Sequence, residues 1–282
     1  MYDIPDLSIV FMGISAFAGI AIPVILFLLF RKKYKADKRP FFIGCAVFFV
    51  FAIILEGTIN NLIFSSALGS TIRNNIWVYA VFGGLMAGVF EETGRFAAFK
   101  TVLKNNRNND HNGLMYGAGH GGFEAFYILF FSMVSYIFMA VQLNAGMYES
   151  LTSGIDDPAM LQKLEATFVA LEKTAPVMFL VGIIERFAAV GLHLSLAVMV
   201  WFAAKNPMRL WLYPFAIFIH AFVNALAVIL ADKTRNILLV EAVIYILVAI
   251  SAVIAFRVWK KSAAEYVQVQ TAELEQEEYS SN

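Results

Sequence analysis

The chain alternates long apolar runs with short charged segments. The runs reach about twenty residues or more, the length that an α-helix needs to cross a bilayer. Alternating segments of about ten residues, which are typical of membrane β-barrels, do not occur. The second run is the weakest by length. We therefore predict an all-α, polytopic bundle with about seven transmembrane helices, at Leu7–Phe30, Phe41–Gly57, Ile76–Leu103, Gly113–Asn144, Ala175–Ala204, Leu210–Ala231 and Ile237–Trp259.

Composition supports a membrane protein. Of 282 residues, 60% are hydrophobic and only 15% are charged, whereas soluble domains are closer to half apolar. No part resembles a soluble domain, and we expect no nucleic-acid partner. Residues 1–262 should form the bundle, with the chemistry in residues 76–231. Residues 263–282 should form an acidic cytoplasmic tail, which we predict to be disordered.

The Lys and Arg residues at the ends of the predicted spans and between them are unevenly distributed. Fourteen lie on the side that includes residues 31–39, and five lie on the other side. Because positively charged loops remain cytoplasmic, we predict the N-terminus outside and the C-terminus in the cytoplasm. We expect a multi-pass protein of a bacterial plasma membrane.

The outer segment between the fourth and fifth spans predicts one short amphipathic helix. Leu161, Leu164, Phe168 and Leu171 follow one another at helical spacing within residues 147–174. Such a helix would lie on the membrane surface or cap the bundle.

Ionisable residues interrupt four of the predicted spans. A charge at mid-bilayer costs at least about 2.5 kcal/mol, so such residues should face the bundle interior and pair with a partner. Counted along each helix at 1.5 Å per residue, most of them lie about 10–20 Å from the cytoplasmic face. Four helices would thus present polar groups in one layer. The set is Glu91, Glu92, Arg95, His120, Glu124, His193, His220 and Asn224.

Spacing within each helix indicates which residues share a face. Glu91 and Arg95 are four residues apart, so we expect them to pair. Glu185 and Arg186 are adjacent, so they should point to different faces and find other partners, and we interpret Glu185 as mainly structural. Glycines crowd the third and fourth spans, where they would let helices approach closely.

A carboxylate and neutral imidazoles in a dry cavity can activate water. The glutamate would take a proton as general base, histidines would hold the water or polarise a carbonyl, and Asn224 would donate to an oxyanion. Arg95 would keep Glu91 ionised and oriented. No cofactor is required by this chemistry, but zinc is the alternative, with His120, His193 and His220 as candidate ligands. The HExxH and GxSxG motifs are absent.

Four motifs in order resemble those of a known superfamily of membrane proteases. They are Glu-Glu-Thr-Gly-Arg at 91–95, Gly-His-Gly-Gly-Phe-Glu-Ala at 119–125, Glu-Arg at 185–186 with His193, and His-Ala-Phe-Val-Asn at 220–224. The first looks like a shortened EExxxR signature of CAAX-processing and bacteriocin-processing proteases. The set is most similar to the YhfC family, which is related to PrsW and to the multi-pass scaffold subunit of γ-secretase. The resemblance covers about half of the chain.

This resemblance implies a glutamic-type intramembrane protease, formerly described as a metalloprotease. It implies Glu91 as the base, His193 and His220 as water-holding groups and Asn224 as the oxyanion partner. Glu124 looks like the acid of the second motif in PrsW-like members, and His120 is distinctive of the YhfC-like pattern. CAAX proteases have three residues between the second glutamate and the basic residue, and this chain has two, so Glu91 and Glu92 both stay candidates for the base.

Two other classes of function fit the same residues. A non-catalytic relative would bind membrane peptides as a scaffold. A proton-coupled transporter would use the buried Glu and His layer as a relay, although no inverted repeat is visible. The substrate would be a membrane-embedded or lipid-proximal peptide. The oligomeric state is left open.

Overall fold

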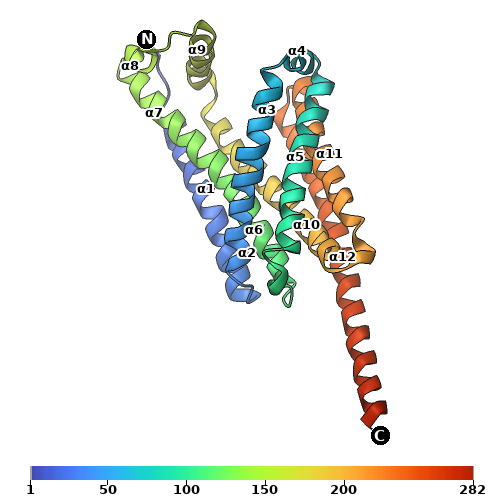
Figure 1. The fold of residues 1–282 in the computed structure, drawn as a ribbon. Coiled ribbons are helices and arrows are strands. Elements are labelled where there is room, and N and C mark those ends of the chain that lie inside the picture. The colour runs from blue at the N-terminus through green and yellow to red at the C-terminus, as the bar shows by residue number, and fades with distance from the viewer. Residues whose placement is uncertain (1, 282) are drawn as a thin grey trace.

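The fold is an all-helical bundle whose long helices run roughly side by side (Figure 1). A computed structural model of the chain describes the backbone of residues 2–281 and the side chains of residues 2–262. Within that part every regular element is a helix. The acidic side chains of residues 263–282 lie outside the described part, so the disordered tail remains a prediction.

The first half of the bundle contains three long helical segments. Each is uninterrupted or joined end to end without a loop. They are α1 (Asp6–Lys33); α2 (Arg39–Val47) with the π-helical turns η1 (Phe48–Glu56) and α3 (Gly57–Phe64); and α5 (Ile76–Lys100), which follows the short α4 (Ala67–Arg73). The second predicted span, Phe41–Gly57, extends further at both ends in the structure. The continuous helix Arg39–Phe64 has 26 residues.

The second half begins after the short turn η2 (Lys104–Asn106). A continuous helical segment of 34 residues comes first, and α10, α11 and α12 complete the bundle. The elements are α6 (His111–Ala125), the π-helical η3 (Phe126–Phe131), α7 (Ser132–Asn144), α8 (Tyr148–Thr152), α9 (Pro158–Lys173), η4 (Pro176–Leu180), α10 (Val181–Lys205), η5 (Pro207–Arg209), α11 (Leu212–Thr234) and α12 (Ile237–Ser281).

Six segments of the described chain are long and apolar enough to cross a membrane. Only α5 among the seven predicted spans falls outside this set, and it is the helix that carries Glu91, Glu92 and Arg95. Its 25 residues would span about 37 Å, enough to cross with the others. The start of α1 and the end of α12 lie at opposite ends of the bundle, as an odd number of crossings requires (Figure 1).

The amphipathic helix predicted in the outer segment is α9. Its residues Phe168 and Leu171 are buried against Ile4, before α1, and Leu143 of α7. The side chain of Asn144 both donates to the carbonyl of Ile4 and accepts from its amide, each over 2.8 Å. Helix α9 therefore caps one end of the bundle.

Glycines bring helix backbones into direct contact at two crossings. A Cβ added to Gly119 of α6 would overlap the carbonyl of Phe41, and one added to Gly44 of α2 would overlap the carbonyl of Tyr116. On the other side of the bundle, a Cβ on Gly88 of α5 would lie 2.8 Å from a carbonyl oxygen of α11. The close approach of helices predicted from the glycine clusters is confirmed. Because their neighbours pack so closely against them, α5 and α6 can carry polar side chains that are buried inside the bundle.

Helix α10 is the centre of the bundle. In the apolar stretch of Pro176–Lys205, which contains α10, 78% of the residues are buried, far more than in any other candidate span. Trp201, in the last turns of this helix, fills the core against Gly113 and donates to Asp110 over 2.7 Å. The polar residues of α10 are thus surrounded by protein rather than by lipid.

Candidate active site

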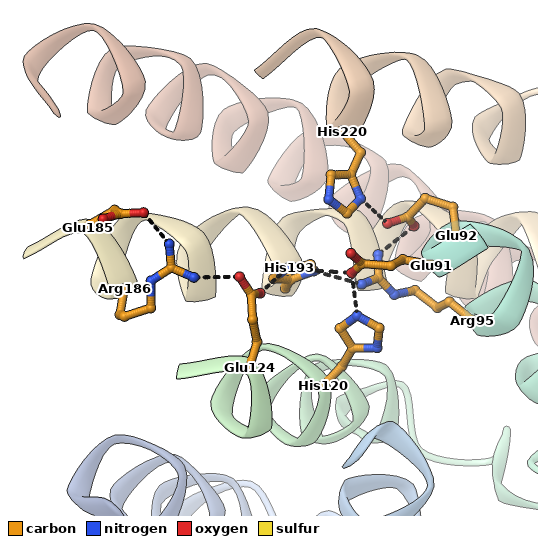
Figure 2. Close-up of polar contacts among 9 residues, drawn as sticks. All are labelled: Glu91, Glu92, Arg95, His120, Glu124, Glu185, Arg186, His193 and His220. Atoms are coloured by element: carbon orange, nitrogen blue, oxygen red, sulfur yellow. Dashed lines mark hydrogen bonds and ion pairs between the residues drawn. The ribbon is translucent and has the colours of Figure 1, made fainter. Parts of the chain in front are cut away.

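The side chain of Glu91 lies where α5, α6 and α10 meet (Figure 2). Its Oε2 is 2.8 Å from Nε2 of His120 and 3.9 Å from Nε2 of His193. Glu91 is 7% exposed, whereas His120 is fully buried and His193 nearly so. One carboxylate oxygen is therefore shared by two imidazoles from different helices.

A second carboxylate, that of Glu92, joins α5 to α11. Glu92 and Arg95 are fully buried and form an ion pair over 2.5 Å, and the other Glu92 oxygen lies 2.9 Å from Nδ1 of His220. A paired, hydrogen-bonded carboxylate satisfies the arginine, which could not otherwise be buried at acceptable cost. Because the carboxylate accepts, Nδ1 of His220 carries a proton and its Nε2 is left with a lone pair.

The guanidinium of Arg95 also reaches His193. Its Nη2 lies 3.0 Å from Nδ1 of that imidazole. An arginine can only donate, so Nδ1 must accept and a neutral His193 carries its proton on Nε2. That nitrogen lies 2.6 Å from Oε2 of Glu124 on α6. The two histidines of α10 and α11 therefore hold opposite tautomers.

Beyond Glu124 the network of polar contacts continues toward the N-terminal end of α10. Arg186 donates to Glu124 over 2.5 Å and also contacts Glu185 (Figure 2). Glu185 and Arg186 were expected to point to different faces and find other partners; Arg186 does reach Glu124, but the two are also in direct contact. The long guanidinium side chain turns back along the helix and bridges two carboxylates.

The predicted pair of Glu91 with Arg95 was wrong. Arg95 pairs with Glu92, three residues earlier, and Glu91 turns toward His120 instead. Spacings of three and four residues both place side chains on one helix face, so sequence spacing did not separate the two partners.

Seven of the eight predicted site residues belong to this one network, and Asn224 lies beside it. A cavity of about 340 Å³ opens next to Glu91 between α10, α11 and α12. Asn224 lines it together with Glu91, His193 and His220. Asn224 therefore borders the same space as Glu91, as an oxyanion donor would need to.

The sequence did not identify three further polar residues as site residues. Arg186 contacts Glu124, and Glu241 of α12 lines the cavity. Tyr116 is fully buried, its hydroxyl lacks a hydrogen-bond partner among the described residues, and Arg95 lies 5.9 Å from its ring centroid. For Arg186 and Glu241 the signal was a charge within an apolar run. Tyr116 gave no such signal.

The spacing of three donor atoms at the centre of the site suits a zinc ion, although the proton on one of them does not. Three possible ligand atoms, one each from Glu91, His193 and His220, lie within 4.8 Å of one another. Two histidines and one glutamate are a known set of ligands for catalytic zinc. The contact between His220 Nδ1 and Glu92 matches the carboxylate–histidine arrangement around zinc ligands. His193 Nδ1 instead faces Arg95, so His193 would have to give up its Nε2 proton to ligate. His120 lies beside this set rather than in it.

Comparison with known proteins agrees with the membrane assignment and with the motifs. A family model described as YhfC intramembrane metalloprotease matches residues 18–245. The chain is 32% identical over 250 residues to a Bacillus subtilis (strain 168) protein described as "Uncharacterized membrane protein YhfC", covering 88% of this chain and 93% of that one. No solved structure matches. This chain is a multi-pass membrane protein, and it belongs to the YhfC intramembrane metalloprotease family.

Proposed function

We propose that the protein hydrolyses a peptide bond of a membrane-embedded or membrane-adjacent substrate, with Glu91 as the general base. The observation that carries this proposal is the position of the Glu91 carboxylate. It borders a cavity and lies among three histidines at the meeting point of the helices. General acid–base groups must lie within reach of the proton that they move, and this carboxylate borders the space that a water and a peptide would fill.

The reaction proceeds in two proton steps. Glu91 takes a proton from water, and the resulting hydroxide attacks the carbonyl carbon of the peptide. The amide of Asn224 donates to the oxyanion that forms on the carbonyl oxygen. When the carbon–nitrogen bond breaks, Glu91 returns its proton to the leaving nitrogen. The products are a carboxylic acid and an amine.

The remaining residues position these groups. Glu92 keeps the proton of His220 on Nδ1, so its Nε2 accepts a hydrogen bond from the water. Arg95 orients Glu92 and His193 together, and His120 fixes the carboxylate of Glu91. Zinc held by Glu91, His193 and His220 would polarise a bound water in the same place.

The test is cleavage of a transmembrane-peptide library by the purified full-length protein in liposomes. Wild type is compared with Glu91→Gln and His220→Ala. Glu149→Gln is a matched control, because Glu149 is an exposed residue of α8. We expect cleavage by wild type and by the control, and a loss of at least about 100-fold in the two site variants.

Other outcomes separate the competing functions. Peptide binding without cleavage by any well-folded form would favour a non-catalytic scaffold. Uptake into vesicles that requires an ion gradient, without cleavage, would favour a proton-coupled transporter. Full activity of Glu91→Gln would exclude Glu91 as the base.

A further inference from the structure

The cavity beside Glu91 has an excess of carboxylates. Glu91, Glu124, Glu185 and Glu241 all line it, and Arg186 is the one Arg or Lys among its lining residues. Arg186 is already paired with Glu124 and Glu185. Carboxylates therefore outnumber the Arg and Lys side chains that line the cavity, even after this internal pairing.

Glu241 is the carboxylate that lacks a partner. It projects from α12, is 7% exposed, and its Oε2 is fully buried without a hydrogen-bond partner among the described residues. An unpaired buried carboxylate is costly, and the cost is largest within a membrane. A bound cation would remove that cost, because its charge would satisfy the oxygen inside the cavity.

The rest of the cavity wall is apolar. Val223 and Ala227 of α11 and Val240, Ile244 and Val248 of α12 line it next to Glu241. At about 340 Å³ the cavity is at the small end of the range for binding pockets, so it holds a few side chains and not a folded domain. An apolar peptide segment that carries one cationic side chain matches both the wall and the charge.

We propose that this cavity selects substrate segments in which a lysine or arginine side chain lies among apolar residues, and that Glu241 binds the cation with help from Glu185. This inference names the substrate class of the proposed protease and rests on that function. The network Glu185–Arg186–Glu124–His193 continues from the cation-binding end to the base (Figure 2). The bound side chain would thus set which peptide bond reaches Glu91.

The test measures binding separately from cleavage. Full-length protein with Glu91→Gln is placed in phosphatidylcholine nanodiscs, so bound peptides are not consumed. The probes are labelled, N-acetylated Leu/Ala peptides of about twenty residues that carry one lysine at successive positions. Each has a partner peptide with norleucine in place of lysine. Fluorescence anisotropy gives the Kd.

We expect lysine peptides to bind about tenfold more tightly than their norleucine partners at one or two positions, as for a hydrogen bond to a charged group. Adding Glu241→Gln should reduce that ratio to about twofold or less. Glu241→Lys should reverse the preference, in favour of glutamate-bearing peptides. Asp232→Asn removes a charge from α11 without touching the cavity lining and should leave the tenfold ratio intact.

Equal binding of lysine and norleucine peptides, including no binding of either, would overturn the inference. So would a lysine preference that survives Glu241→Gln. A preference for peptides with a free amino terminus over acetylated ones, with no effect of lysine, would assign the cation to the terminus and overturn the side-chain proposal. A Glu241-dependent lysine preference in a protein that cleaves none of these peptides with Glu91 intact would support the cation site and contradict the protease.

Discussion

The guanidinium of Arg95 lies 3.0 Å from Nδ1 of His193 and thereby fixes which nitrogen of that imidazole carries the proton. The same guanidinium holds Glu92, which sets the opposite tautomer in His220. One residue that never borders the cavity therefore controls the hydrogen-bonding direction of two histidines that do.

Arg95→Lys tests this control. Lysine keeps the charge but offers a single nitrogen on a flexible chain, so it cannot hold Glu92 and His193 in one planar geometry. We expect cleavage to fall about 100-fold while the protein stays folded. Arg73→Lys, at an exposed arginine of α4, should have no effect. Unchanged cleavage by Arg95→Lys would show that tautomer control is unimportant.

Glu92→Gln should destabilise the protein more than Glu91→Gln. Loss of the Glu92 charge leaves a fully buried arginine without its counterion, at a cost of about 3–5 kcal/mol. In the described part of the chain, Glu91 contacts no arginine or lysine, so the Glu91→Gln variant leaves no buried cationic side chain without its counterion. Thermal unfolding of both variants in one detergent measures the difference. Equal midpoints would argue against the assignment of Arg95 to Glu92.

Gly119→Ala should separate α6 from α2. A methyl group there would overlap the carbonyl of Phe41, a backbone atom that cannot move aside alone. We expect a loss of about 1–3 kcal/mol or more in the free energy of unfolding. Gly83→Ala is the matched control, since nothing lies within 4 Å of its added Cβ. A stable Gly119→Ala protein would mean that this crossing is looser than described.

Phe168→Ala should destabilise the cap formed by α9 without altering the site. Phe168 is fully buried against the start of the chain and α7, so its truncation should cost about 3–5 kcal/mol. Met160→Ala, at a position that is 58% exposed in the same helix, should cost little. Cleavage measured well below the unfolding temperature should be the same in both. Selective loss of cleavage in Phe168→Ala would instead place α9 in substrate binding.

Cleavage should persist when a chelator removes zinc, because the proposed base is a carboxylate and His193 holds a proton on the nitrogen that would ligate. Loss of cleavage that added zinc restores would contradict this expectation and assign the chemistry to the metal. Elemental analysis then identifies the ligands. In that outcome, bound zinc would be lost in His193→Ala and His220→Ala. It would be kept in His120→Asn, since His120 lies outside the set of close donor atoms.

The sequence predicted where helices lie and which residues meet, because hydropathy and depth along a helix are local properties. It placed Glu91, His120, His193 and His220 in one layer, and the structure brings them into one network. The second span was underestimated because Glu56 ends its apolar run, whereas the helix continues to Phe64 through polar residues.

Partner choice within that layer was beyond the sequence. Arg95 can reach back three or four residues along its helix, and its contacts with Glu92 and His193 depend on how α10 and α11 pack against α5. The contact of Arg186 with Glu124 likewise depends on how α10 crosses α6. The burial of Trp201 was likewise not predictable, because an aromatic residue near a span end has the same sequence signature whether lipid or protein surrounds it.

The glycine crossing between α2 and α6 has a consequence for how the protein can change over evolutionary time. Two backbones in contact at Gly44 and Gly119 leave no side chain whose size could be altered, so the helix that carries His120 and Glu124 tolerates little variation there. Helix α12 faces the cavity through Val240, Glu241, Ile244 and Val248, which are ordinary side chains that substitution can enlarge, shrink or recharge. The shape and charge of the cavity can therefore diversify through α12, while the crossing that holds α6 in place stays fixed.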